Sequence, residues 1–204
     1  NELIDSITKS KYYKNSSDLV QYYLPKHQQF NILKGNYQTA IATLQIQLEN
    51  IKKNNNKQSE NHIYEMLTNC YQKMGIQDSS LYYASCLYNS LRATTEEQYH
   101  QSILDAAILK AEVLSNMGQS GEAFKYLKVA DNNARHLSNL GEDSYLNFQY
   151  RKALIYLESN SLSSTGIKIL DSLSSLYNGQ LHLNKDKYGQ INMNMADWYF
   201  KHRQ

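Results

Sequence analysis

Proline and glycine are scarce in this sequence, whose 204 residues include one proline and 8 glycines. Proteins built from many short strands use these residues in their hairpins and sheet corners, so the scarcity favours helices. The two cysteines, Cys70 and Cys86, have neither a CxxC spacing nor a neighbouring histidine pattern that would indicate a metal site. We expect both to be small core or interface residues.

Long apolar runs and concentrated charge are also missing. No stretch approaches the roughly 20 apolar residues that cross a bilayer, so we expect no membrane contact from this chain. The formal net charge is +2, and lysine and arginine are spread along the sequence. Phosphate contacts need a dense basic face, so no nucleic-acid binding is expected. With 41% apolar and 20% charged residues, the chain belongs to the folded class rather than the disordered one.

Motifs of catalysis are absent as well. The six histidines are scattered, and none lies in HExxH or another recognised ligand spacing. His62 and Glu65 lie three apart and would share a helix face, where a surface ion pair is the favoured interpretation over a metal site. The Gly-x-Ser-x-Gly motif, the P-loop and the dinucleotide fingerprint are all missing. The sequence therefore predicts no enzyme, no cofactor and no metal.

What the sequence does contain is an internal repeat. A helical pattern breaks four times at Gly or Asn, with spacings of 40, 43 and 42 residues, at positions 35, 75, 118 and 160. Glycine and asparagine best tolerate the left-handed conformation that often follows a helix. A small residue follows each break and would let the second helix approach the first closely: Ala40, Ser80, Ala123 and Thr165. This period fits two helices and two short loops.

Apolar residues recur at helical spacing on both sides of each break. We therefore predict a single repeat domain over 1–204, with hairpins at about 17–57, 58–98, 99–140 and 141–182 and a partial unit at 183–204. The first helix of the first hairpin lacks the expected aromatic and small residues, having Gln28 and Asn31 instead, and is expected to be a terminal cap. Upstream, Asn1 to Tyr13 suggests a short amphipathic helix.

The turn Gly35-Asn-Tyr37-Gln-Thr-Ala40-Ile41, and its weaker copies at Gly118 and Gly75, resemble the tetratricopeptide repeat. The resemblance covers roughly residues 20 to 204. It implies an all-α fold, a right-handed α-α superhelix of about four hairpins plus terminal helices. The period exceeds the family's usual 34, and the proline that commonly ends each repeat is absent.

In this family the first helix of each hairpin lines a concave groove that binds protein or peptide. When the groove-facing positions of the family's first helices are matched to this sequence, the resemblance implies ten groove residues: Glu65, Asn69, Lys73, Ile108, Glu112, Asn116, Tyr150, Arg151, Leu154 and Glu158. This set is mixed in charge. It does not reproduce the clamp of lysine, asparagine and arginine with which some relatives hold a peptide's terminal carboxylate.

Tyrosine is abundant, with 18 residues, several of them in doublets such as Tyr12-Tyr13, Tyr22-Tyr23 and Tyr82-Tyr83. We expect one ring of each doublet to face a helix interface and the other to face solvent or a neighbouring helix. Packing is the favoured interpretation, because a tyrosine fills a wide gap while its hydroxyl reaches water. An aromatic surface for a partner is the alternative.

The resemblance is nearest to bacterial regulators in which divergent long repeats precede a membrane helix and an output domain. It implies a protein or peptide partner, or self-association as a homodimer. The alternatives are a free-standing scaffold or cell-envelope lipoprotein, and a cytoplasmic receptor for signalling peptides. We expect a fragment of a longer protein, with an extracytoplasmic location favoured over a cytoplasmic one.

Overall fold

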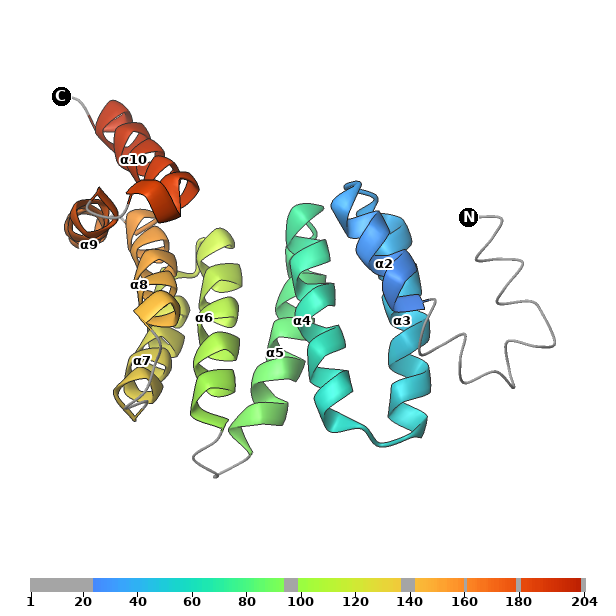
Figure 1. The fold of residues 1–204 in the computed structure, drawn as a ribbon. Coiled ribbons are helices and arrows are strands. Elements are labelled where there is room, and N and C mark those ends of the chain that lie inside the picture. The colour runs from blue at the N-terminus through green and yellow to red at the C-terminus, as the bar shows by residue number, and fades with distance from the viewer. Residues whose placement is uncertain (1–23, 94–98, 137–141, 160, 179–180, 203–204) are drawn as a thin grey trace. The chain divides into compact units, whose positions relative to one another are not determined.

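The computed structural model describes residues 24–93, 99–136, 142–159, 161–178 and 181–202, and most of these residues are α-helical. Within these ranges there is no strand, and helices follow one another through short loops (Figure 1). Helices that are neighbours in sequence pack against each other within each part of the chain. The prediction of an all-α helical-repeat fold is thereby confirmed. The expected helix over Asn1 to Tyr13 lies outside the described residues.

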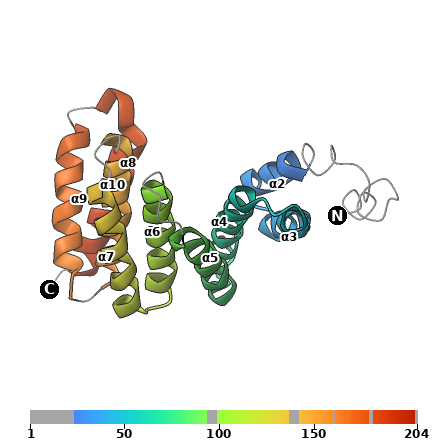
Figure 2. The ribbon, with the colours of Figure 1, turned by 90° about the horizontal axis from the view of Figure 1, so that it is seen from below.

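The described residues fall into two compact units, divided between Thr94 and Thr95. The N-terminal unit contains two hairpins, in which the first helix is called helix A and the second helix B. Their bounds are α2 (Leu24–Leu33), α3 (Tyr37–Lys53), α4 (Lys57–Lys73) and α5 (Gln77–Arg92). Within the unit α2 packs on α3, α3 on α4 and α4 on α5 (Figure 2).

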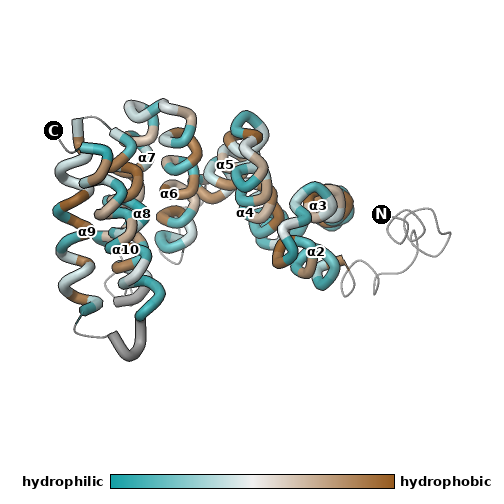
Figure 3. Tube along the Cα trace, turned by 90° about the horizontal axis from the view of Figure 1, so that it is seen from above, coloured by the Kyte–Doolittle hydropathy of each residue, from teal (hydrophilic) through white to brown (hydrophobic). Residues whose placement is uncertain are grey.

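The C-terminal unit continues with two hairpins and a further helix. Their bounds are α6 (His100–Asn116), α7 (Ser120–His136), α8 (Glu142–Leu157), α9 (Ser163–Asn178) and α10 (Leu181–Lys201). Contacts join each helix to the next, and α6 also contacts α8, so the two A helices of this unit are neighbours. Apolar and polar residues alternate along the helices (Figure 3), as expected for helices that each bury one side.

The turns inside the hairpins are built by glycine, as the sequence predicts. Gly35, Gly75 and Gly118 have φ angles of +73°, +71° and +73°. At Gly118 the glycine N–H bonds the carbonyl of Ser115 at 2.8 Å, and the next N–H bonds the carbonyl of Leu114 at 2.9 Å. The other two turns repeat this pattern. All three are Schellman motifs, which satisfy helix-end carbonyls and need a residue that tolerates positive φ.

This chemistry predicts opposite effects for two nearby glycines. Gly118→Ala should lower the free energy of unfolding by about 1 kcal/mol, because alanine is strained at positive φ. Gly121→Ala should raise it by up to about 1 kcal/mol, because Gly121 lies in the ordinary helix α7 and nothing is within 4 Å of an added Cβ. Urea denaturation of both variants measures the difference. Equal effects of the two substitutions would contradict the assigned turn.

A small residue is buried at the fourth position of every B helix. Ala40, Ser80 and Ala123 are fully buried, as predicted from sequence. In the last hairpin, however, the buried small residue is Gly166 and not Thr165, which is exposed. The reason is loop length, because five residues separate α8 from α9 whereas three separate the helices of the other hairpins. The predicted break at Asn160 lies outside the described residues.

The last hairpin and α10 share one hydrophobic core. Buried residues from α8, α9 and α10 form it: Leu146, Ala153, Leu170, Leu173, Tyr177 and Ile191. On α8, Tyr145 is 46% exposed, whereas Phe148, one turn further on, is buried. Helix α10 begins at Leu181, two residues before the partial unit expected at 183–204.

Helix α2 buries polar side chains. Gln28 and Asn31, where an aromatic and a small residue were expected, are 4% and 5% exposed. Gln47 of α3 donates to the Gln28 side-chain oxygen at 3.3 Å, and the Asn31 amide donates to the carbonyl of His27 at 2.8 Å. Because buried amides keep partners, the polar face is compatible with close packing on α3.

Candidate binding surface

Three of the ten predicted groove residues form an exposed row on α4 in the N-terminal unit. Glu65, Asn69 and Lys73 are all exposed and lie four residues apart, so they share one face of the helix. The row spans eight residues, or about 12 Å along the helix axis. It offers a carboxylate, an amide and an ammonium group. Beside the row, His62 Nδ1 lies 4.0 Å from a Glu65 oxygen, and both side chains are more than half exposed.

Two other predicted residues come together in the C-terminal unit. Arg151 of α8 donates from Nε and Nη2 to the two carboxylate oxygens of Glu112 on α6, each at 2.6 Å. Both side chains are about one quarter exposed. Such a bidentate pair fixes the guanidinium and carboxylate groups in one plane and is stronger than a single hydrogen bond. Its charges are therefore satisfied internally, and the pair joins two neighbouring A helices rather than offering two free charges to a ligand.

The remaining residues of α6 are divided between core and surface. Ile108 is fully buried, so the prediction that it lines an open groove is wrong. Helix α6 buries ten of its seventeen residues, on nearly all sides. The helical positions that are exposed in α4 therefore do not identify the exposed face of α6. Asn116, the last residue of α6, is exposed.

Of the remaining predicted residues, Tyr150 of α8 lies against α10. Tyr150 is half-buried against the shared core, and its hydroxyl accepts a hydrogen bond from Asn194 of α10 at 3.0 Å. Burial raises the pKa of Tyr150, and the Asn194 hydrogen bond opposes this only in part. Leu154 is half-buried and Glu158 is exposed. Tyr150 is thus used in packing, whereas Glu158 is exposed in the turn directly after α8.

Sequence reasoning missed a lysine site on the other side of α8. Lys152 Nζ lies 2.6 and 2.7 Å from the two carboxylate oxygens of Asp131 on α7. The same ammonium group lies 5.8 Å from the ring centroid of Phe148 and 5.7 Å from that of Tyr156. Ion pair and rings together stabilise the charge of a side chain that is 14% exposed. No sequence motif indicates this lysine site. Asp131 lies 21 residues before Lys152, and Phe148 and Tyr156 lie one helical turn to either side of it.

Tyrosines gather between α4 and α5 as the doublet pattern predicts. Tyr83 stacks on Tyr71 with ring centroids 5.7 Å apart and lies 6.1 Å from Tyr64, while Tyr82 is 61% exposed. One ring of this doublet therefore packs and the other faces solvent, which confirms the prediction for Tyr82-Tyr83. The doublets at 12–13 and 22–23 lie outside the described residues.

Beside these rings, Glu60 is buried with its charge satisfied. The Tyr64 hydroxyl donates to one of its carboxylate oxygens at 2.5 Å, and Lys57 Nζ donates to the other at 3.0 Å. Burial alone would raise the pKa of Glu60, but these hydrogen bonds and the charges of Lys57 and Lys52 outweigh it, so the pKa is lowered from 4.5. The pKa of Tyr64 is raised, first by burial and then by its bond to Glu60.

A pH dependence of stability follows from the lowered pKa of Glu60. Its ionised form stabilises the fold above pH 4.5, and this contribution is lost as pH falls through the lower folded-state pKa. Glu60→Gln should cost about 1 kcal/mol at pH 7, because the amide accepts a weaker hydrogen bond from Tyr64. The difference in the free energy of unfolding between Glu60→Gln and the unmodified chain should shrink in acid. Unfolding measured at pH 7 and pH 3 tests this, and a deficit that grows in acid would refute it.

Among the residues described, no three His, Cys, Asp or Glu side chains gather closely enough to hold a metal ion. Cys70 is buried and Cys86 is half-buried, and both are free thiols. Across the described helices, none combines the length and apolar character required to span a bilayer. Comparison with models of known protein families and with curated proteins finds no match to the chain.

Proposed function

We propose that this chain is a non-enzymatic helical-repeat module of tetratricopeptide type that binds a protein or peptide segment. The observation that supports the proposal is the exposed row of Glu65, Asn69 and Lys73 on helix A of the second hairpin. The row lies on a long, regular helix, and side chains on such an element are held more precisely than side chains on loops.

The chemistry of the row suits an extended peptide. Asn69 can both donate to and accept from a peptide backbone, because its amide has two donors and one acceptor oxygen. Glu65 and Lys73 flank it at a spacing of one turn on either side, so they favour a segment with a basic and an acidic side chain about 12 Å apart. A mixed-charge peptide is therefore the proposed ligand class.

A role in a larger signalling protein is the finer proposal. Repeat modules of this kind serve as the sensory or assembly part of bacterial regulators, and the Gly-x-Tyr-x-x-Ala turn at Gly35 supports that relationship. No second function is favoured by a specific contact in the described residues.

Selection from a displayed peptide library on the immobilised chain tests the binding proposal. Peptides selected by the chain should bind about tenfold more weakly to Lys73→Glu, because one attractive contact becomes repulsive. Lys53→Glu on α3 makes the same charge change at another exposed lysine and should leave the affinity within about twofold. If both variants weaken binding equally, or no peptide is enriched over a blank surface, the proposed row is not the ligand site.

A further inference from the structure

Helices α2 and α4, the two A helices of the N-terminal unit, are in direct contact. Gln28 of α2 donates from Nε2 to the Met66 sulfur of α4 at 2.8 Å. Gln47 of α3 donates to the Gln28 side-chain oxygen, which fixes the orientation of this amide. Both A helices lie on one side of the unit, with α3 and α5 on the other (Figure 2). The faces that α2 and α4 turn away from their B helices therefore belong to one surface.

The turn glycines give the correspondence between these two faces. Glu65, Asn69 and Lys73 lie ten, six and two residues before Gly75. The residues at the same distances before Gly35 are also exposed: Pro25, Gln29 and Leu33. Because corresponding residues of stacked hairpins face the same way, the charged row on α4 has a second row beside it on α2.

Leu33 makes the second row apolar at its end. Its side chain is 78% exposed. In the next two A helices the corresponding position holds Lys73 and Asn116, which are polar and exposed. The open surface thus changes from a charged residue on α4 to an apolar residue on α2 at the same level of the repeat.

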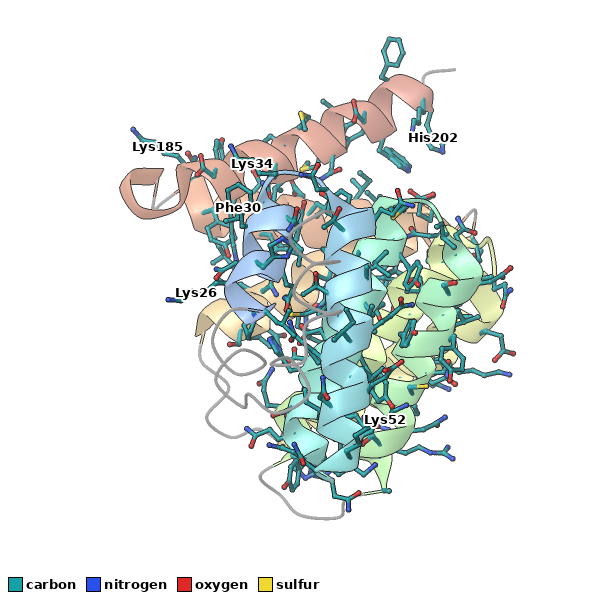
Figure 4. All side chains as sticks on the ribbon, turned by 90° about the vertical axis from the view of Figure 1, so that its right-hand side faces the viewer. Lys26, Phe30, Lys34, Lys52, Lys185 and His202 are labelled. Carbon is teal, nitrogen blue, oxygen red and sulfur yellow. The ribbon has the colours of Figure 1, made fainter. Side chains whose placement is uncertain are left out.

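Phe30 enlarges the apolar surface at Leu33. It lies one turn earlier in α2 and is 57% exposed. Figure 4 shows Phe30 on the side of α2 that faces away from α3. The corresponding residues of α4 and α6 are Cys70 and Val113, which are 2% and 1% exposed. Two adjacent apolar side chains that both depart from the repeat form a patch, here called the Phe30–Leu33 patch.

The charge beside the Phe30–Leu33 patch is positive. The Lys34 ammonium lies 5.8 Å from the Phe30 ring centroid. Helix α2 contains no acidic residue, and Lys73 has on α4 the position that Leu33 has on α2. An acidic side chain of a ligand is attracted to this end of the surface, whereas a basic one is repelled.

The packing of the two helices sets the spacing that a ligand needs. Axes of packed helices lie about 8–10 Å apart, so Leu33 and Lys73 are separated by about this distance. An extended chain advances about 3.3–3.6 Å per residue, so three residues span it. The row runs along α4 and the patch lies across from it, so the ligand turns at the side chain that meets Lys73.

We propose that the Phe30–Leu33 patch is the apolar subsite of the α4 row. The ligand is then a peptide segment with a large apolar side chain about three residues from the acidic side chain that meets Lys73. This inference rests on the proposed function, because the patch extends a peptide site on α4. An anionic membrane also attracts apolar side chains next to lysines, but a peptide is favoured because the patch continues the row and has only two large apolar residues.

The affinity of selected peptides for the full chain, measured by titration calorimetry, tests the subsite. Peptides from the library selection should carry the acidic and apolar residues three apart, and Leu33→Ser should weaken their binding about tenfold. Leu176→Ser on α9 makes the same change at another exposed leucine and should leave the affinity within about twofold. Replacing the apolar residue of the peptide by serine should weaken binding to the unmodified chain but not further weaken binding to Leu33→Ser, because both changes remove one contact.

The outcomes separate the subsite from the proposed function. If Lys73→Glu weakens binding and Leu33→Ser does not, the α4 row remains the peptide site and the subsite alone is wrong. If neither substitution weakens binding, or no peptide is enriched, both proposals are wrong. Additive losses from Leu33→Ser and the peptide substitution would contradict the contact between them.

Vesicles of phosphatidylserine and phosphatidylcholine test the membrane alternative. The proposal predicts that Leu33→Ser leaves cosedimentation of the chain with these vesicles unchanged. If Leu33→Ser instead abolishes cosedimentation and leaves the peptide affinity unchanged, the patch contacts lipid and the peptide subsite is refuted.

Discussion

Replacing Gly166 by valine should destabilise the C-terminal unit more than any other single substitution considered for this chain. A Cβ at Gly166 would lie 2.8 Å from the backbone oxygen of Ala153 and 3.1 Å from both Cδ2 and the backbone nitrogen of Leu157. Because two of these atoms are backbone, α9 must move away from α8 to admit the side chain. We expect Gly166→Ala to cost about 1–3 kcal/mol and Gly166→Val to cost more, measured as the free energy of unfolding in urea.

The control for this prediction is another helical glycine of the same unit. Gly189 lies in α10 with nothing within 4 Å of an added Cβ, so Gly189→Ala should be neutral or stabilising by up to about 1 kcal/mol. A well-tolerated Gly166→Val would mean that α8 and α9 do not meet at this glycine.

Removing the Arg151 side chain should have the second largest effect. Arg151→Ala leaves Glu112 without its two 2.6 Å bonds between α6 and α8. Because both side chains are about one quarter exposed, water compensates in part, and we expect a loss of about 1–2 kcal/mol in the free energy of unfolding. Arg151→Lys should recover less than half of this loss, because an ammonium group cannot reproduce the two parallel bonds.

The exchange Glu112→Arg with Arg151→Glu separates pairing from packing. The double variant should be more stable than either single charge reversal, since opposite charges face each other again. If the stability losses of the two single charge reversals simply add in the double variant, the two side chains do not pair in solution.

Much of the fold follows from local chemistry that the sequence displays. Each of three turns requires a residue with positive φ, which glycine tolerates, and the small residue five positions later is fully buried. Both signals are short-range, so one sequence suffices to find the first three hairpins. In the last hairpin the loop is longer, and counting from Asn160 places the small residue at Thr165 instead of Gly166.

The candidate binding surface was harder to predict because it depends on which side of each helix remains open. On α4 the predicted row of Glu65, Asn69 and Lys73 is exposed. On α6 the same reasoning selected Ile108, which is fully buried. The pairing of Glu112 with Arg151 joins residues 39 apart in sequence, and only packing of α6 beside α8 brings them together.

Contacts between protons of neighbouring helices, measured by nuclear Overhauser effects on the full chain in solution, test the pairing of consecutive helices into hairpins most directly. The fold predicts contacts from Gly166 Hα to the Leu157 methyl groups, and from Ser80 to Thr68, whose carbonyl accepts from the Ser80 hydroxyl at 3.1 Å. If Gly166 or Ser80 instead contacts a helix other than the one directly before it in the chain, consecutive helices do not pair as hairpins and the repeat architecture is wrong.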